Sequence, residues 1–173
     1  MNGKIVGTAL VGAAALAGAA LYVLEHHYWY DIVFEGDGIV VLTRVDGARE
    51  EIAVEALQHA EGASSPLKFR ACFEVAPALL ARLDVFAPAA EPTPTVAPRP
   101  FACFDAAAIA EALDSGAATA LISLTNEPYG IDRIVALTET GAGYAWHQIN
   151  RCGARVFDGD PPPESCPPPP ETE

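Results

Sequence analysis

The sequence predicts an α+β protein: a single N-terminal transmembrane helix, then a small exported domain with two β-hairpins and two short helices. Three observations lead to this prediction. An uncharged apolar run occupies most of the first 24 residues, segments of alternating apolar residues follow it, and two later segments have helical spacing. With 173 residues, the chain has room for one modest domain beside the helix.

The apolar run covers residues 5–24 and reads IVGTALVGAAALAGAALYVL. At about 1.5 Å per residue, roughly 20 helical residues cross the hydrocarbon core of a bilayer. Lys4 precedes the run, whereas Glu25 and Asp31 follow it. The positive-inside rule therefore places residues 1–4 in the cytoplasm and everything after the run outside. An interfacial aromatic belt is predicted on the outer side, formed by Tyr22, Tyr28, Trp29 and Tyr30.

A cleaved signal peptide is the alternative interpretation of this run. Ala17-Gly18-Ala19 satisfies the small-residue cleavage pattern. The apolar run continues beyond that site to Leu24, where the aromatic belt begins, which favours an uncleaved anchor. Both interpretations export the rest of the chain.

The span is rich in small residues that recur every four positions. In lipid, such spacing lets two helix backbones approach closely, which favours packing against a membrane-protein partner. The alternative is an Ala-rich composition with no further meaning. The candidate helix-packing residues are Thr8, Ala9, Gly12, Ala13, Ala17 and Gly18.

The charge balance restricts the partners of the exported part. The net charge is −13 although 51% of the residues are hydrophobic, because 23 acidic and 9 basic side chains lie after Leu24. Such a surface repels phosphate backbones, which argues against nucleic-acid binding. The expected partners are the lipid bilayer that holds the helix and a membrane protein.

The exported α+β domain is predicted to cover residues 25–157, followed by a disordered, Pro-rich acidic tail at 158–173. Asp46-Gly47 marks the turn of the first hairpin, and Asp105 and Gly116 mark the start and stop of a helix. The predicted elements are a hairpin at 39–56, a strand at 67–73, a helix at 75–84, an extended Pro-rich connector at 85–100, a helix at 105–116, a strand at 119–125 and a hairpin at 131–149.

Ala-Cys-Phe-acid occurs twice, at residues 71–74 and 102–105. We expect each copy to mark a strand-to-helix corner at which the acid caps the helix. Four cysteines in an exported domain favour disulfides, with three pairings open. The equivalence of the two copies favours Cys72 with Cys103, which leaves Cys152 with Cys166.

Few residues suggest other chemistry, and the sequence predicts no cofactor and no metal site. His147 and Cys152 are a weak candidate zinc pair. A structural zinc site needs four ligands, and no further Cys or His lies at a spacing typical of one. Glu25-His26-His27 could bind a metal or sense pH, but interfacial side chains are the favoured interpretation.

A candidate ligand face consists of Tyr144, Trp146 and Arg133 on the second hairpin. Simple packing of Trp146 is the favoured alternative. No nucleophile elbow, phosphate-binding loop or metal triad is present in the sequence. An enzyme that uses Ser123 or His147 is therefore a minor alternative, and no catalytic residue is assigned.

Four segments together carry a family resemblance, namely SSPLKFRACF, FACFDAAAIAEAL, YGIDRIVAL and YAWHQINRCG. Behind an Ala/Gly-rich span, they resemble a family of small uncharacterised proteins of alphaproteobacteria. The resemblance implies a Gram-negative inner membrane and a periplasmic domain. Some members are labelled histidine kinase, but this sequence has no ATP-binding glycine motif and no phosphoacceptor helix.

The expected function is that of a non-enzymatic accessory or assembly subunit of a larger inner-membrane complex. A periplasmic module that binds a small ligand or peptide is the alternative.

Overall fold

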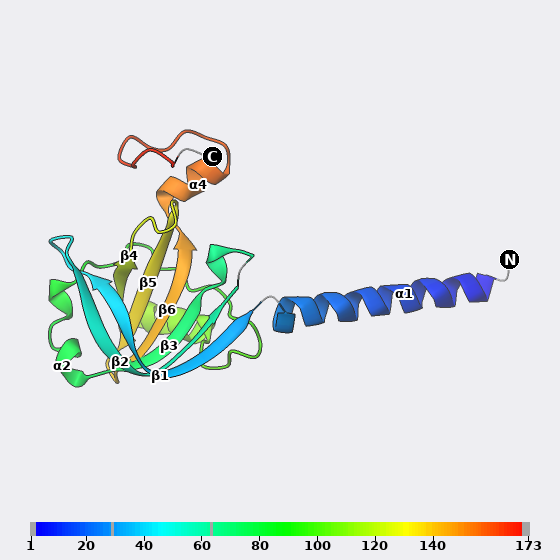
Figure 1. Ribbon diagram of the computed structural model, residues 1–173, viewed down its shortest axis with the longest axis horizontal. Helices are drawn as coiled ribbons and strands as arrows, with labels where there is room; N and C mark the ends of the chain where they lie inside the picture. The colour runs from blue at the N-terminus through cyan, green and yellow to red at the C-terminus, as the bar shows by residue number, and fades with distance from the viewer. Residues whose placement is uncertain (1–2, 29, 63, 171–173) are drawn as a thin grey trace.

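A computed structural model describes residues 3–28, 30–62 and 64–170. Helix α1, Gly3–Val23, extends away from the rest of the molecule and continues into a π-helical turn, Leu24–Tyr28 (Figure 1). It is the one described helix long and apolar enough to cross a membrane, and none of its apolar window is buried against the protein. The structure therefore has a candidate membrane anchor where the sequence predicts one.

The remaining chain forms a six-stranded antiparallel sheet in the order β1-β2-β3-β6-β5-β4, with short helices around it (Figure 1). The predicted α+β class is confirmed. The strands are β1 (Asp31–Thr43), β2 (Arg49–Glu61), β3 (Arg70–Val75), β4 (Ala118–Leu124), β5 (Ile131–Thr138) and β6 (Ala142–Ile149). The helices are α2 (Pro77–Leu80), α3 (Ala106–Ser115) and α4 (Arg151–Phe157), with single 3-10 turns at Pro66–Lys68 and Leu83–Val85.

The sheet curls until its two edge strands meet. The Thr43 hydroxyl donates to Ser123 O at 2.7 Å, and the Ser123 hydroxyl donates to Val41 O at 2.6 Å. Residues 85–89 fill the rest of the seam, since Ala87 N donates to Thr43 O and Ala89 N donates to Ala120 O. The backbone at this seam is thus bonded on both sides, which leaves no open edge there.

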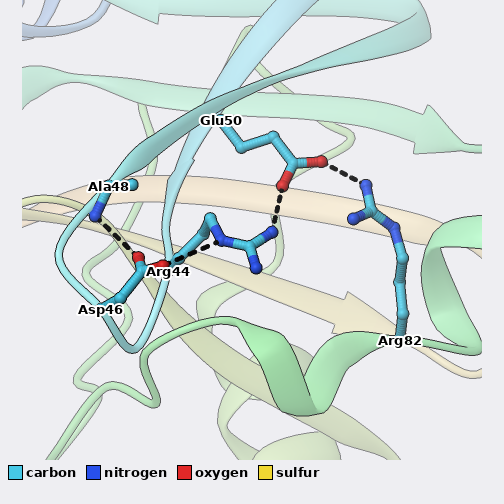
Figure 2. Close-up of polar contacts among 5 residues, drawn as sticks. All are labelled: Arg44, Asp46, Ala48, Glu50 and Arg82. Carbon is cyan, nitrogen blue, oxygen red and sulfur yellow. Dashed lines mark hydrogen bonds and ion pairs between the residues drawn. The ribbon is translucent and has the colours of Figure 1, made fainter.

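A cluster of charged side chains attaches Arg82, just before the seam residues 85–89, to the first hairpin. Figure 2 shows the Glu50 carboxylate between the guanidinium groups of Arg82 and Arg44. Arg82 and then Arg44 hold the pKa of Glu50 below its usual range. Asp46 accepts from Ala48 N at 3.0 Å and orders the tight turn beside this cluster.

Two apolar clusters lie on opposite faces of the curled sheet. The inner one joins Leu42 of β1 to Leu121 of β4, so it fills the inside of the curl, and Leu79 of α2 packs into it. The outer one packs Trp146 against Phe104 and the first turns of α3. Since period-2 alternation sends neighbouring residues to opposite faces, each central strand serves both clusters.

Local capping explains where two helices begin and end. Asp105 accepts from the N–H groups of residues 107 and 108, and Gly116 ends α3 with a left-handed φ of 79°. Asn150 caps α4 in the same way, by accepting from the N–H groups of residues 152 and 153. Helix α4 was not predicted from the sequence, although an Asn before the segment RCGARVF is a recognisable start signal.

Several predicted boundaries and roles are wrong. Within 75–84, Val75 still belongs to β3, and the rest forms only α2 and a separate 3-10 turn. Glu74 also remains in β3, paired with Glu55 and Ala142, and caps no helix. The two copies of Ala-Cys-Phe-acid are therefore not equivalent corners: Cys72 lies within a strand and Cys103 lies in a turn.

The connector at 85–100 is not a freely solvated linker. Phe86 pairs with Arg44, directly after β1, and Pro88 pairs with Leu121 of β4, while Phe86 is 2% exposed. The first hairpin is longer than predicted, since β1 begins at Asp31 and β2 ends at Glu61. Residues 158–170 form neither helix nor strand.

Candidate functional site

An open groove of about 850 Å³ lies on the outer face of the sheet, beyond the area that α3 covers. Its floor includes Ile122 of β4 and Ile134 of β5, one wall is the connector around residues 88–95, and the other wall is the start of α4 with the tail residues Ser165 and Pro167. A volume of this size is in the range of small-molecule sites. The groove is thus the leading candidate for a binding site.

Gln148 of β6 ties the floor to the connector wall. Its Oε1 accepts from Thr93 N at 2.9 Å and from Trp146 Nε1 at 3.1 Å, and its Nε2 donates to Glu91 O at 3.3 Å. One amide therefore joins the buried indole, which is 0% exposed, to two positions of the connector. The backbone at Glu91 is bent into the left-handed region, with a φ of 50°.

Arg70 holds the connector farther along. Although the side chain is a cation, Arg70 is only 4% exposed. Its Nε donates to Thr95 O at 2.8 Å, one Nη donates to Leu67 O at 2.8 Å, and the other donates to the Thr95 hydroxyl and to Val96 O. Burial lowers the pKa of Arg70 to about 10, so the side chain remains charged at neutral pH. Arg70 thus binds backbone carbonyls of two segments and leaves little donor capacity for a ligand.

The opposite wall depends on a close backbone contact and on a disulfide. Gly130, with a φ of 82°, lies against Gly153 so closely that a Cβ on Gly153 would overlap Gly130 O. Cys152 is joined to Cys166, and the Tyr129 hydroxyl donates to Pro167 O at 2.9 Å. These contacts fix α4 on the β4–β5 loop and bring the tail beside the groove.

The disulfides have the connectivity that the sequence favours. Cys72 is joined to Cys103, and Cys152 to Cys166. The first bond attaches the turn before α3 to the middle strand of the sheet, although not for the reason expected, because the two cysteines are not in equivalent positions. Together with α1, the two disulfides indicate a membrane-anchored domain.

The predicted ligand face does not exist as one surface. Arg133 is the register partner of His147, while Trp146 is the partner of Ile134 and Tyr144 that of Ala136. Directly paired residues project to the same side of a sheet, so Arg133 lies on the side opposite the two aromatic residues. Trp146 is also fully buried under Phe104.

His147 and Arg133 form a polar cluster on the inner face. His147 Nε2 accepts from Arg133 Nε at 2.9 Å, so its Nδ1 carries the proton and donates to Pro66 O at 2.6 Å. Phe69 stacks on the imidazole with a centroid distance of 4.8 Å and lies under the Arg133 guanidinium. Burial lowers the pKa of His147 to about 4, and the Arg133 charge acts in the same direction.

This cluster predicts a pH-dependent stability. Because the pKa of His147 is about 4 in the folded chain and near 6.5 when unfolded, the unfolded state binds an extra proton between these values. The contribution of neutral His147 to the free energy of unfolding is complete above about pH 6.5 and is lost as the pH falls toward 4. The free energy of unfolding should fall by about 2 kcal/mol between about pH 7 and 5. Urea unfolding of the full chain in detergent micelles would measure this loss.

His147→Gln is the matched control, because glutamine bonds at the same place without titrating. The variant should be less stable at neutral pH but should lose clearly less of its free energy of unfolding on acidification. Equal pH slopes for the two proteins would contradict the role assigned to His147.

The other residues that the sequence suggests for catalysis or metal binding are either bonded within the fold or outside the described structure. The Ser123 hydroxyl is used in the seam, and His147 is bonded on both nitrogens. The weak zinc pair is excluded because Cys152 is in a disulfide. Among the side chains that the structure describes, no group of three or more His, Cys, Asp or Glu could hold a metal ion. The side chains of His26 and His27, and all of Trp29, lie outside the described structure.

The fold and the groove define a small, disulfide-bonded α+β domain behind a candidate membrane helix. Residues 39–167, well over half of the chain, match the model of a family of unknown function (DUF6446). The chain belongs to this family, which agrees with the uncharacterised family that the sequence suggests. Searches of the curated proteins and of the solved structures found no match.

Proposed function

We propose that this protein is a non-enzymatic, membrane-anchored accessory or assembly subunit of a larger inner-membrane complex. Its N-terminus would lie in the cytoplasm and its disulfide-bonded domain in the periplasm of an alphaproteobacterium. The charge distribution around α1 supports this orientation, because Lys4 lies before the helix and the acidic surplus lies after it.

The exposure of α1 is the observation that carries this proposal. The helix buries no residue against the rest of the described chain, and a Cβ at Gly12 or Gly18 would have no described atom within 4 Å beyond the backbone of its own helix. Small residues at spacing four leave a shallow surface on which a second helix packs closely in lipid. The helix is thus suited to bind a partner as well as to anchor the domain.

Replacing Gly12 with leucine tests the helix as an interface. We expect recovery of the partner with the tagged full chain, extracted in mild detergent, to fall about fivefold or more, because the leucine side chain separates the helices. Val11→Leu is the matched control, since it enlarges an already large side chain on the neighbouring face. Unchanged recovery with Gly12→Leu would contradict the role of the helix surface.

The groove supports a second candidate function, a membrane-anchored binding or sensor module for a small ligand or peptide. Its volume and its mixture of apolar floor and polar walls are typical of such sites. A saturable rise in melting temperature with added ligand would support this function, because a ligand that binds only the native state stabilises it.

A further inference from the structure

We propose that the groove binds a zwitterionic ligand of the amino-acid or short-peptide class with an apolar side chain. This inference rests on the second candidate function and names its ligand. It follows from two opposite charges without partners on the two walls and from the apolar floor between them.

Arg151 supplies the positive charge, at the wall formed by α4. Within the described chain it is the one arginine with no ion pair, hydrogen bond or ring contact, even though the chain has 23 acidic residues. The other seven all have partners, such as Arg155 with Asp160 at 3.2 Å and Arg49 with Glu127. A guanidinium presents two parallel N–H groups that match a carboxylate.

Glu91 supplies the negative charge, at the connector wall. Its backbone carbonyl accepts from Gln148, but no described group pairs with its carboxylate. Asp132 adds a second acid at the floor. One of its oxygens accepts from Asn126 N at 2.9 Å and from Asn150 Nδ2 at 2.7 Å, while the other has no partner in the described residues. An ammonium group would be favoured beside either acid.

The space between the charges suits an apolar side chain. The floor is the half-buried Ile122 over the buried Ile134, and the exposed Pro88 and Pro167 line the two walls. The hydroxyls of Thr125 and Ser165, which also line the groove, make no hydrogen bond within the described structure, so they could bond to a peptide group. A purely anionic or purely cationic ligand would leave one of the two walls facing a like charge.

The test uses the full chain in detergent micelles and isothermal titration with four probes. L-leucine and L-leucyl-L-leucine carry both charges, leucyl-leucinamide lacks the carboxylate, and N-acetyl-leucyl-leucine lacks the ammonium group. We expect the zwitterions to bind about tenfold or more tightly than either modified dipeptide, since a bond to a charged group is lost in each. The ratio between leucine and its dipeptide distinguishes a free amino acid from a peptide as the ligand.

Four variants assign the charges. Arg151→Gln should remove the preference for the free carboxylate over the amide and leave the preference for the free amine. Glu91→Gln should weaken the preference for the free amine, Glu91→Gln with Asp132→Asn should remove it, and both should leave the preference for the carboxylate. Arg155→Gln, on the same helix but outside the groove, should change neither. Binding that does not discriminate among the probes would overturn the zwitterion assignment while leaving the binding module intact. Absence of saturable binding by all four probes would also overturn the zwitterion assignment, and the binding module would then be decided by the melting-temperature test with other ligands.

Discussion

Replacing Arg70 with methionine should lower the free energy of unfolding by about 2–3 kcal/mol. Methionine fills a similar volume, but the carbonyls of Leu67, Thr95 and Val96 lose a donor that is itself only 4% exposed. A carbonyl left without a bond away from water costs about 1–3 kcal/mol, and this cost applies to the half-buried Leu67 more than to the exposed Thr95 and Val96, which water can reach. Urea unfolding of the full chain in micelles would measure the change.

Arg155→Met is the control for Arg70→Met, because it removes an arginine of the same size whose ion pair with Asp160 is exposed. Such a pair contributes at most about 1 kcal/mol. Arg70→Lys should rescue little, since one ammonium cannot reach carbonyls on two segments. Similar losses for Arg70→Met and Arg155→Met would show that Arg70 does not hold the connector.

Removing the disulfide between Cys72 and Cys103 should cost about 3–4 kcal/mol, because a bond across 31 residues restricts the unfolded chain strongly. The loop that this disulfide closes, residues 72–103, contains the whole connector at 85–100, including the seam residues 85–89. The native contacts of the connector therefore depend on the disulfide. The double variant Cys72→Ala/Cys103→Ala would be compared with the parent chain by unfolding in urea.

The other disulfide provides an internal comparison. Cys152 and Cys166 are 14 residues apart, and residues 158–170 between and beyond them form neither helix nor strand. Cys152→Ala/Cys166→Ala should therefore cost less in global stability and should mainly increase proteolysis of the tail. An equal or larger global loss would mean that the tail carries more of the fold than its contacts indicate.

The parts of the fold that depend on near neighbours could be predicted from the sequence. The Asp46-Gly47 turn and both ends of α3, at Asp105 and Gly116, were predicted because a turn or cap involves only the next few residues. The role of Glu74 was wrong for the opposite reason. The same four letters lie in a strand in one copy and before a helix in the other, and cross-strand partners decide between the two.

The candidate site could not be predicted in the same way. Alternation shows which residues of β6 share a face, but it does not give the register with β5, and a shift of one residue reverses the face on which Arg133 lies. The prolines predict an extended connector but not what it contacts. Its attachment depends on Arg70 and Gln148, which are distant in the sequence and whose partners are mostly backbone atoms.

The junction between α1 and the domain limits where the protein can act. Only residues 29 and 30 separate the turn that ends at Tyr28 from the start of β1 at Asp31, so the tether spans no more than about 10 Å. With α1 in a bilayer as proposed, the domain is confined to a shell roughly 40 Å deep next to the lipid. It would search for partners by diffusion in two dimensions, at a high local concentration of other proteins in the same membrane. A target held farther from the membrane would have to come to the domain.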